Sequence, residues 1–512
     1  MVKFFSSNFF WFSLVSLMAS FFRVTSMDLI EFKADEAINL FLASRPLFGY
    51  PFLPGSTVSS LGILNFPLLN YILFPYVLIS QDPQIITFII GLINSLAIGF
   101  LFLIFKKYYG IRIALIASFL FAFSPWAIIF SRKIWAQDFI IPLSVPLIWS
   151  LHKIVSEKKE RFWVLFVTSS LFLIQLHQSS IFFLLPLVLF LLIKNKPKIK
   201  YLTLGFLIGL LPALHYLLYQ LINGCPDCLS LINTRQRLTQ NFFPIIFARP
   251  FQILGRGNIQ TVIGDDMVNF LKQFPVSFNL QKVFYLEYIL LPLGFYAFWK
   301  AFKKLRFLLL SIIALPFLYF VFHIEPFLHY FIIVIPFLFL FLAFSIDLLL
   351  KNKLFIMKGI GLLIFLAILT SSISFNLSFF ELIKRERGLK GDYGQIFSQS
   401  EKNHKQSLKE YINDPYYKEM LIISYIPLNL LHGNIGIAKM LYDEKTIENN
   451  LNLIEKRLRE VPQDPRIHAE LVYYYTRSKP TKETVFMLAE KAKDIKGYQA
   501  VHGEVERFYL EK

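Results

Sequence analysis

The sequence predicts an all-α polytopic membrane protein with a mostly helical C-terminal domain outside the cytoplasm. Apolar residues make up 55% of the 512 residues and charged residues only 17%, whereas soluble domains carry about 25% charge. The mean hydropathy is +0.54. Long apolar runs fill the first 376 residues, and the rest has an ordinary soluble composition. These observations exclude an ordinary cytosolic enzyme and a disordered chain.

The spans are expected to be helices, because a bilayer offers no partner to unpaired backbone groups. We expect eleven, at residues 4–22, 84–105, 113–130, 138–151, 162–176, 180–193, 201–222, 284–299, 307–322, 331–350 and 359–376. Several are shorter than the about 20 residues that a perpendicular span needs. The first run is interpreted as an anchor, since no convincing small-residue cleavage site follows it.

The charges of the short loops predict the topology. Of the 30 basic residues before residue 376, 19 lie in six short pieces on one side of the expected spans. Lysine and arginine stay cytoplasmic, so the opposite loops, among them 23–83 and 223–283, are placed outside. The sequence therefore predicts a transmembrane domain at 1–376 and an extracytoplasmic domain at 377–512. Most acidic residues before residue 376 also lie in the outer loops. They either make these loops soluble or belong to a functional site there.

Two features stand out in the first outer loop. Asp35 and Glu36 follow the first span. Adjacent carboxylates can serve as a base with a supporting or metal-binding partner, although acids also favour the solvated first turn of a helix. The segment 65–79 is too short to span comfortably and is expected to lie in the membrane interface as a helix.

Cations and histidines mark three further outer positions. Arg132 and Lys133 interrupt the inside-positive trend, which indicates either an anionic ligand or contact with outer headgroups. His177 ends a span, and His329 lies six residues after His323, a spacing unlike that of a helical metal pair. Outside the cytoplasm, the C-x-x-C pair Cys225 and Cys228 is expected to form a small structural disulfide.

In order along residues 20–350, these elements resemble the GT-C glycosyltransferases, specifically the protein-mannosyltransferase and aminoarabinose-transferase-like group (glycosyltransferase family 39-like). The matching elements are Asp35-Glu36-Ala37, Pro67-Leu-Leu-Asn-Tyr71, Ser124-Pro-Trp126 with Ser131-Arg132 and Gln137-Asp138, Leu176-His177, and Leu328-His-Tyr330 before Pro336. Family members commonly have an arginine where His329 stands.

The resemblance implies an inverting sugar transfer from a polyprenyl-phosphate donor to a protein, lipid or glycan acceptor outside the cytoplasm. It implies Asp35 as the base and Glu36 as its support. It also implies a set of residues that binds the donor phosphate and the substrate: Arg132, Lys133, Gln137, Asp138, His177, His329 and Tyr330. Whether a divalent metal bridges the phosphate is left open, and no metal is assigned.

The sequence leaves two other functions open. A transporter or flippase for a lipid-linked or anionic solute should carry ionisable sites near the bilayer midplane and an internal repeat, and neither is clear here. A scaffold that displays the tail leaves the outer acids, cations and histidines without a use. The tail reads as helices at 447–459, 465–477 and 481–493. The expected location is the plasma membrane, with membrane lipids and no nucleic acid as partners.

Overall fold

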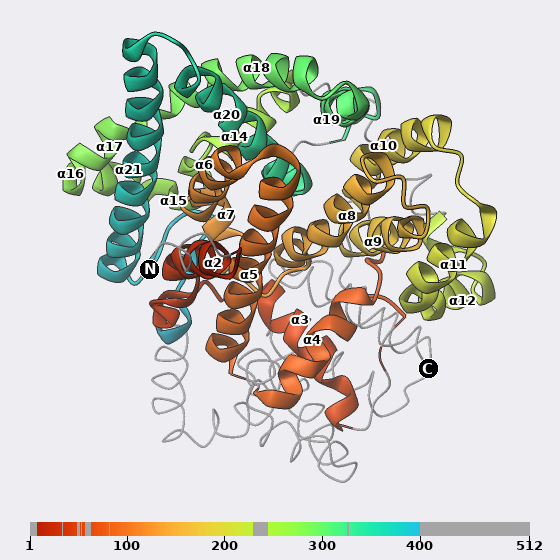
Figure 1. Ribbon diagram of the computed structural model, residues 1–512. Coiled ribbons are helices and arrows are strands. Elements are labelled where there is room, and N and C mark those ends of the chain that lie inside the picture. Colours follow the sequence, from red (N-terminus) through yellow and green to blue (C-terminus); the bar gives the residue numbers. More distant parts are fainter. Residues whose placement is uncertain are drawn as a thin grey trace, which may run out of the picture. The chain divides into compact units, whose positions relative to one another are not determined.

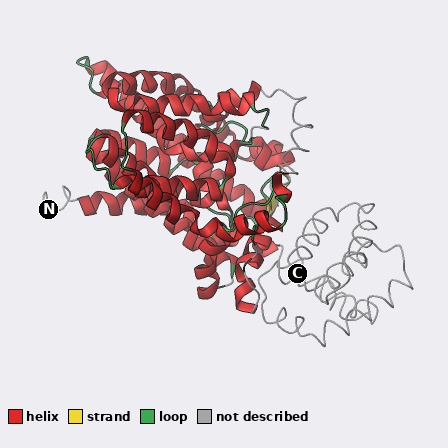
Figure 2. Ribbon diagram, turned by 90° about the vertical axis from the view of Figure 1, so that its right-hand side faces the viewer, coloured by secondary structure: helices red, strands yellow, loops and turns green. Residues whose placement is uncertain are grey.

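The computed structural model describes residues 8–32, 34–48, 52, 54–56, 63–80, 82–228, 244–324 and 327–399. Helices make up most of this part of the chain, and two short strands form its one small sheet (Figure 2). The tail helices expected at 447–459, 465–477 and 481–493 lie outside the described residues.

The elements follow one another in this order. The α-helices are α2 (Asn8–Val24), α3 (Ala34–Ser44), α4 (Leu68–Ile79), α5 (Pro83–Tyr109), α6 (Ile111–Ala122), α7 (Pro125–Ile129), α8 (Ile140–Val155), α9 (Phe162–Leu176), α10 (Ile181–Lys194), α11 (Ile199–Leu210), α12 (Leu214–Ile222), α14 (Arg249–Leu254), α15 (Gln260–Ile263), α16 (Met267–Gln273), α17 (Pro275–Gln281), α18 (Phe284–Ala301), α19 (Arg306–Val321), α20 (Ile335–Leu350) and α21 (Phe355–Glu386). The 3-10 helices η3 (Ala136–Phe139), η4 (Gln178–Ser180) and η9 (Leu328–Val334) lie between them, and the strands are β1 (Gly388–Leu389) and β2 (Gly394–Gln395).

The chain divides into two compact units. The first contains residues 1–32, 54–72 and 84–397, and the second contains residues 33–53, 73–83 and 398–512. The first unit holds most of the helices, and the second includes α3.

The predicted all-α polytopic class is confirmed. Each expected span coincides with one helix or with two consecutive helices. By length and composition, six helical stretches can cross a membrane: Pro83–Tyr109, Ala136–Val155, Ile199–Ile222, Lys303–Val321, Leu328–Leu350 and Phe355–Glu386. Shorter apolar helices include Asn8–Val24, Phe162–Leu176 and Gln178–Lys194. The number of spans stays a prediction.

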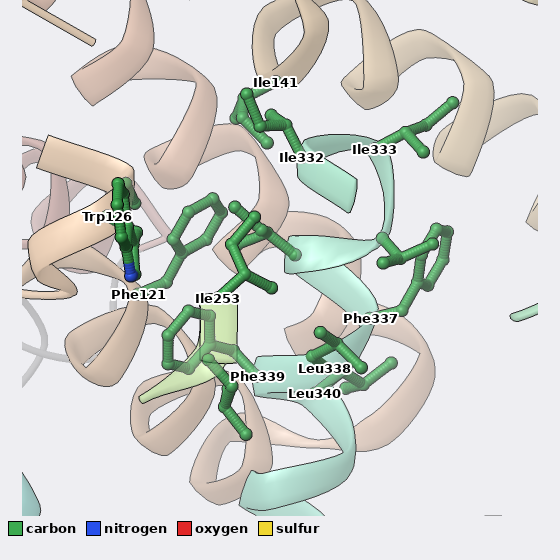
Figure 3. Packing of buried hydrophobic residues seen from close by; sticks show 14 of the residues in the cluster. Phe121, Trp126, Ile141, Ile253, Ile332, Ile333, Phe337, Leu338, Phe339 and Leu340 are labelled. Carbon is green, nitrogen blue, oxygen red and sulfur yellow. The ribbon is translucent and has the colours of Figure 1, made fainter. Parts of the chain in front are cut away.

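The core of the first unit surrounds α20. This helix packs against α6, α18 and α21 (Figure 1), and its residues from Ile335 to Asp347 are all buried. Figure 3 shows Phe339 of α20 near Phe121 of α6 and Ile253 of α14, and the two phenyl rings stack with centroids 5.4 Å apart. A helix that is apolar all round in this way is surrounded by other helices rather than by lipid.

A close backbone contact anchors the segment after α21. The amides of Asp392 and Tyr393 donate to the carbonyls of Thr261 and Val262, at 2.8 and 3.2 Å. A Cβ atom on Gly391 would lie 2.5 Å from the nitrogen of Gly264, so only glycine fits this crossing. The same segment reaches the start of the chain, because the Phe397 amide donates to the carbonyl of Ile30 at 2.9 Å.

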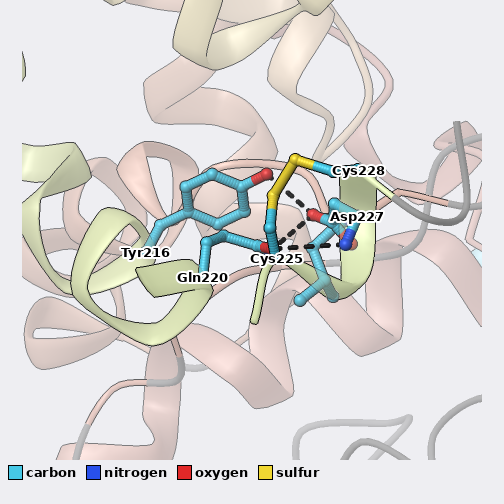
Figure 4. The surroundings of a disulfide bond; sticks show 6 residues. Tyr216, Gln220, Cys225, Asp227 and Cys228 are labelled. Atoms are coloured by element: carbon cyan, nitrogen blue, oxygen red, sulfur yellow. Dashed lines mark hydrogen bonds between the residues drawn. A yellow bond between two sulfur atoms is a disulfide. The ribbon is translucent and has the colours of Figure 1, made fainter. Parts of the chain in front are cut away.

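The disulfide expected between Cys225 and Cys228 is present, and it encloses a buried carboxylate (Figure 4). Asp227 Oδ2 accepts hydrogen bonds from the Tyr216 hydroxyl at 2.7 Å and from Gln220 Nε2 at 2.8 Å. It also accepts the backbone amide of Leu64 at 3.1 Å. The disulfide turn therefore ties α12 to the first outer loop.

Candidate active site

Four of the predicted site residues meet in the first unit, together with Trp135. Lys133 Nζ lies 4.6 Å from the centre of the Trp135 ring, and that ring lies 5.8 Å from the ring of His329. The His177 ring is 5.5 Å from His329 and 5.0 Å from Tyr330. Three segments far apart in the sequence, before α8, after α9 and before α20, thus build one cluster of a cation and aromatic rings.

An ion pair holds the cation of this cluster. Lys133 Nζ is 2.5 Å from Glu31 Oε2, and the two side chains are 9% and 2% exposed. A buried ammonium group is costly unless an opposite charge accompanies it. Glu31 therefore stabilises Lys133 as a cation beside Trp135. A lysine ammonium group carries a full positive charge and three N–H donors.

The neighbouring cation, Arg132, has a different environment. Its Nη1 donates to the carbonyls of Phe22 and Thr25 at 2.7 and 2.6 Å, and its Nη2 donates to Ser26 at 2.7 Å. The last carbonyls of a helix have no intrahelical partner, and Arg132 supplies partners at the end of α2. Burial lowers the pKa of Arg132 to about 10, so the group remains charged at neutral pH. Its terminal N–H groups point to the chain's own backbone.

Gln137 and Asp138 lie in η3, directly after the cation loop. Asp138 Oδ2 accepts the Trp135 amide at 3.1 Å, and the carbonyl of Asp138 accepts Asn94 Nδ2 at 2.9 Å. Asp138 is buried and Gln137 is half-buried. The Asp138 carboxylate therefore fixes the turn that carries Trp135 into the cluster.

His177 lies at the carboxyl end of α9, where its ring is positioned by Ser179. The two side chains form a short hydrogen bond between His177 Nδ1 and Ser179 Oγ. Burial lowers the pKa of His177 to about 4. The imidazole is therefore neutral at pH 7 and acts as a hydrogen-bonding group rather than as a cation.

The predicted carboxylate pair belongs to the second unit. Asp35 and Glu36 lie in the first turn of α3, where acids favour the helix start. Asp35 is exposed, whereas Glu36 is buried with 1% of its surface accessible. The two neighbours therefore differ: Asp35 is accessible to a reactant, and Glu36 is not.

Sequence reasoning did not predict the Glu31–Lys133 pair. The two residues are about a hundred positions apart, and neither has a local pattern that predicts the other. Trp135, the one aromatic residue between Ser131 and Asp138, is the signal that could have indicated a role for this loop.

The described residues offer little to a metal ion. Within them, no group of three or more histidine, cysteine, aspartate or glutamate side chains gathers at metal-binding distances. The rings of His177 and His329 are close together. A zinc site needs at least three protein ligands, and the described residues supply no third ligand beside these two.

A family comparison bears on this arrangement. Residues 67–219 match the sequence model of the dolichyl-phosphate-mannose-protein mannosyltransferases. The match confirms the predicted resemblance. The mannosyltransferase-like segment begins at the expected interfacial helix and includes Lys133 and His177. No curated protein matches the chain.

Two solved structures are similar to this chain in fold. Both are crystal structures of ArnT from Cupriavidus metallidurans. The one bound to undecaprenyl phosphate has a TM-score of 0.42 at 14% identity, and it covers 72% of this chain and 75% of its own. The apo structure has a TM-score of 0.43 at 12% identity, covering 72% of this chain and 74% of its own.

Proposed function

We propose that this protein is a membrane glycosyltransferase that moves a sugar from a polyprenyl-phosphate donor to an acceptor outside the cytoplasm, with inversion. The family match at 67–219 supports the reaction class. The observation that carries the proposal is the cluster of Lys133, Trp135, His177 and His329, built from three segments on one predicted side of the membrane. We further propose that the protein lies in the plasma membrane with residues 377–512 outside the cytoplasm.

In this proposal, Lys133 binds the donor phosphate. Charge-assisted hydrogen bonds from an ammonium group stabilise the negative charge that grows on a leaving phosphate. The rings of Trp135 and Tyr330 offer apolar faces to the sugar, and the neutral His177 offers a hydrogen bond. Arg132 is a positioning residue, because its terminal N–H groups hold the end of α2.

Asp35 is proposed as the base. It takes the proton from the acceptor hydroxyl as the acceptor oxygen bonds to the anomeric carbon. The bond from that carbon to the phosphate oxygen breaks, and polyprenyl phosphate leaves with the electron pair. One base suffices for a single inverting displacement.

The test uses the full-length protein in membranes supplied with a labelled polyprenyl-phosphate sugar. Asp35→Asn should reduce transfer by at least a hundredfold, as expected for loss of a general base, and Lys133→Gln should reduce it similarly. Asp82→Asn is the matched control for Asp35, since both residues are exposed, and Lys198→Gln controls for the loss of a lysine charge at an exposed position. Both controls should retain transfer.

Two results would contradict the proposal. If Asp35→Asn transfers sugar as fast as the unmodified protein does, Asp35 is not the base. If the unmodified protein transfers sugar to none of the acceptors but moves the labelled donor across the membrane, the protein is a flippase.

A further inference from the structure

An apolar groove runs along the membrane-spanning region between α5 and α8. Its volume is about 650 Å³, within the range of about 300–1,000 Å³ typical of ligand pockets. On α5 the lining repeats every three to four residues from Ile93 to Tyr108, which is one continuous helix face. On α8 it extends to Trp149. An apolar cavity stays dry, so the lining of this groove suits a hydrocarbon chain rather than water.

The groove has one polar end. Lys107 and Tyr108 are the polar residues of its lining, and both lie at the end of α5 that the loop charges place in the cytoplasm. The tyrosine hydroxyl donates to Glu157 at 2.7 Å, and Lys107 Nζ is 2.5 Å from the same carboxylate. A ligand with one charged end and one apolar end therefore has a single orientation here.

The charge at this end is positive. Three lysines surround the one carboxylate of Glu157: Lys107, Lys153 at 2.9 Å and Lys159 at 3.0 Å. Their hydrogen bonds, with that of Lys107 the largest, lower the pKa of Glu157 well below its usual range. The cluster therefore has an excess of two positive charges, and Lys153 Nζ also lies 5.6 Å from the centre of the Trp149 ring.

We propose that this groove binds an anionic phospholipid of the cytoplasmic leaflet, with one acyl chain between α5 and α8 and its phosphate at Lys107. The length agrees with this occupant. From Ile93 to Tyr108 the helix rises about 22 Å, and one leaflet with its headgroups is about 20–22 Å thick. The site is separate from the Lys133 cluster and does not depend on the proposed sugar transfer.

The test measures quenching of Trp149 fluorescence in the purified full-length protein in detergent micelles. The probes are phosphatidylglycerol and phosphatidylcholine with dibrominated acyl chains, and Trp149→Phe supplies the background. Phosphatidylglycerol should quench Trp149 at a lower mole fraction than phosphatidylcholine does. Lys107→Gln should weaken phosphatidylglycerol binding about fivefold, the equivalent of about 1 kcal/mol per lysine near an anionic headgroup.

Matched controls separate charge from shape. Lys106→Gln changes the adjacent lysine, which donates to Asn8 Oδ1 and does not line the groove, and it should leave the preference intact. Ala97→Phe places a ring in the groove and should reduce quenching by both lipids, whereas Ala367→Phe on α21 should not. If Ala97→Phe does not fold, the comparison of Lys107→Gln with Lys106→Gln tests the proposal by itself. The Lys107 side chain is 52% exposed, so its replacement should not prevent folding.

Three outcomes would overturn the proposal. Equal quenching by the two lipids would show that the groove does not select an anionic headgroup. A preference that survives Lys107→Gln would show that Lys107 does not bind the phosphate. If unlabelled polyprenyl phosphate displaces brominated phosphatidylglycerol at a lower concentration than unlabelled phosphatidylglycerol does, the groove belongs to the lipid-linked donor.

Discussion

The Glu31–Lys133 pair should be strongly coupled in a double-mutant cycle. At 2.5 Å, two unit charges attract by about 7 kcal/mol at an effective dielectric constant of 20. Desolvation of the two ions offsets most of this gain, so replacing both residues should cost little. Removing one alone leaves a buried charge without its counterion, at about 3–5 kcal/mol. We therefore expect Glu31→Gln and Lys133→Met each to destabilise by about 3–5 kcal/mol and the double variant to cost little, which corresponds to a coupling energy of at least about 5 kcal/mol.

The assay is unfolding of the four purified proteins by a rising mole fraction of sodium dodecyl sulfate in mixed micelles, followed by tryptophan fluorescence. The matched control is the cycle on Lys198 and Glu160, a pair at 3.3 Å whose side chains are 65% and 45% exposed. Such exposed pairs couple by less than about 1 kcal/mol. If the effects at Glu31 and Lys133 add to within about 0.5 kcal/mol, the pair does not hold the cluster as argued.

Three further predictions concern stability. The pKa of His177, about 4 in the folded protein against about 6.5 in an unfolded chain, means that the unfolded chain binds more protons between these pH values. The free energy of unfolding should therefore fall as the pH drops from 6.5 to 4, and His177→Gln should flatten this dependence. Reducing the Cys225–Cys228 disulfide should cost about 2 kcal/mol, the loop-entropy value for a four-residue loop, with a double serine variant insensitive to the reductant. Gly391→Ala should cost about 1–3 kcal/mol and speed proteolysis after α21, because its Cβ would meet Gly264. Gly359→Ala, which meets no atom within 4 Å, should be neutral or slightly stabilising.

Most helices could be predicted because the apolar runs have clear ends. Residues 162–176 were expected as a span, and α9 has these bounds. The expected span 113–130 is instead divided into α6 and α7, because Ser124 is extended before Pro125 and the residue before a proline avoids helical geometry. Helix α21 continues past residue 376 to Glu386, since hydropathy marks only the part of a helix that faces lipid.

The sequence predicted only which site residues lie on the same side of the membrane. Alternation of the loops across the membrane placed Lys133, His177 and His329 on one side, and the structure brings them together. It did not indicate that Glu31 pairs with Lys133, or that Arg132 caps a helix from more than a hundred residues away. Such contacts depend on packing between helices, which a single sequence does not encode in any local spacing.

Arg132 and Lys133 are adjacent but have different roles, because their side chains differ in chemistry. The planar guanidinium of Arg132 has several donors at fixed angles and can therefore satisfy three carbonyls at the end of α2. Lys133 has a single ammonium group, which Glu31 holds in a buried ion pair. The Phe397 amide donates to the carbonyl of Ile30. Residues 26–31 are thus held at both ends, by the cation loop and by the segment after α21. Arg132 and Lys133 thus both hold this segment, whereas the sequence left open an anionic ligand or contact with outer headgroups for the two cations.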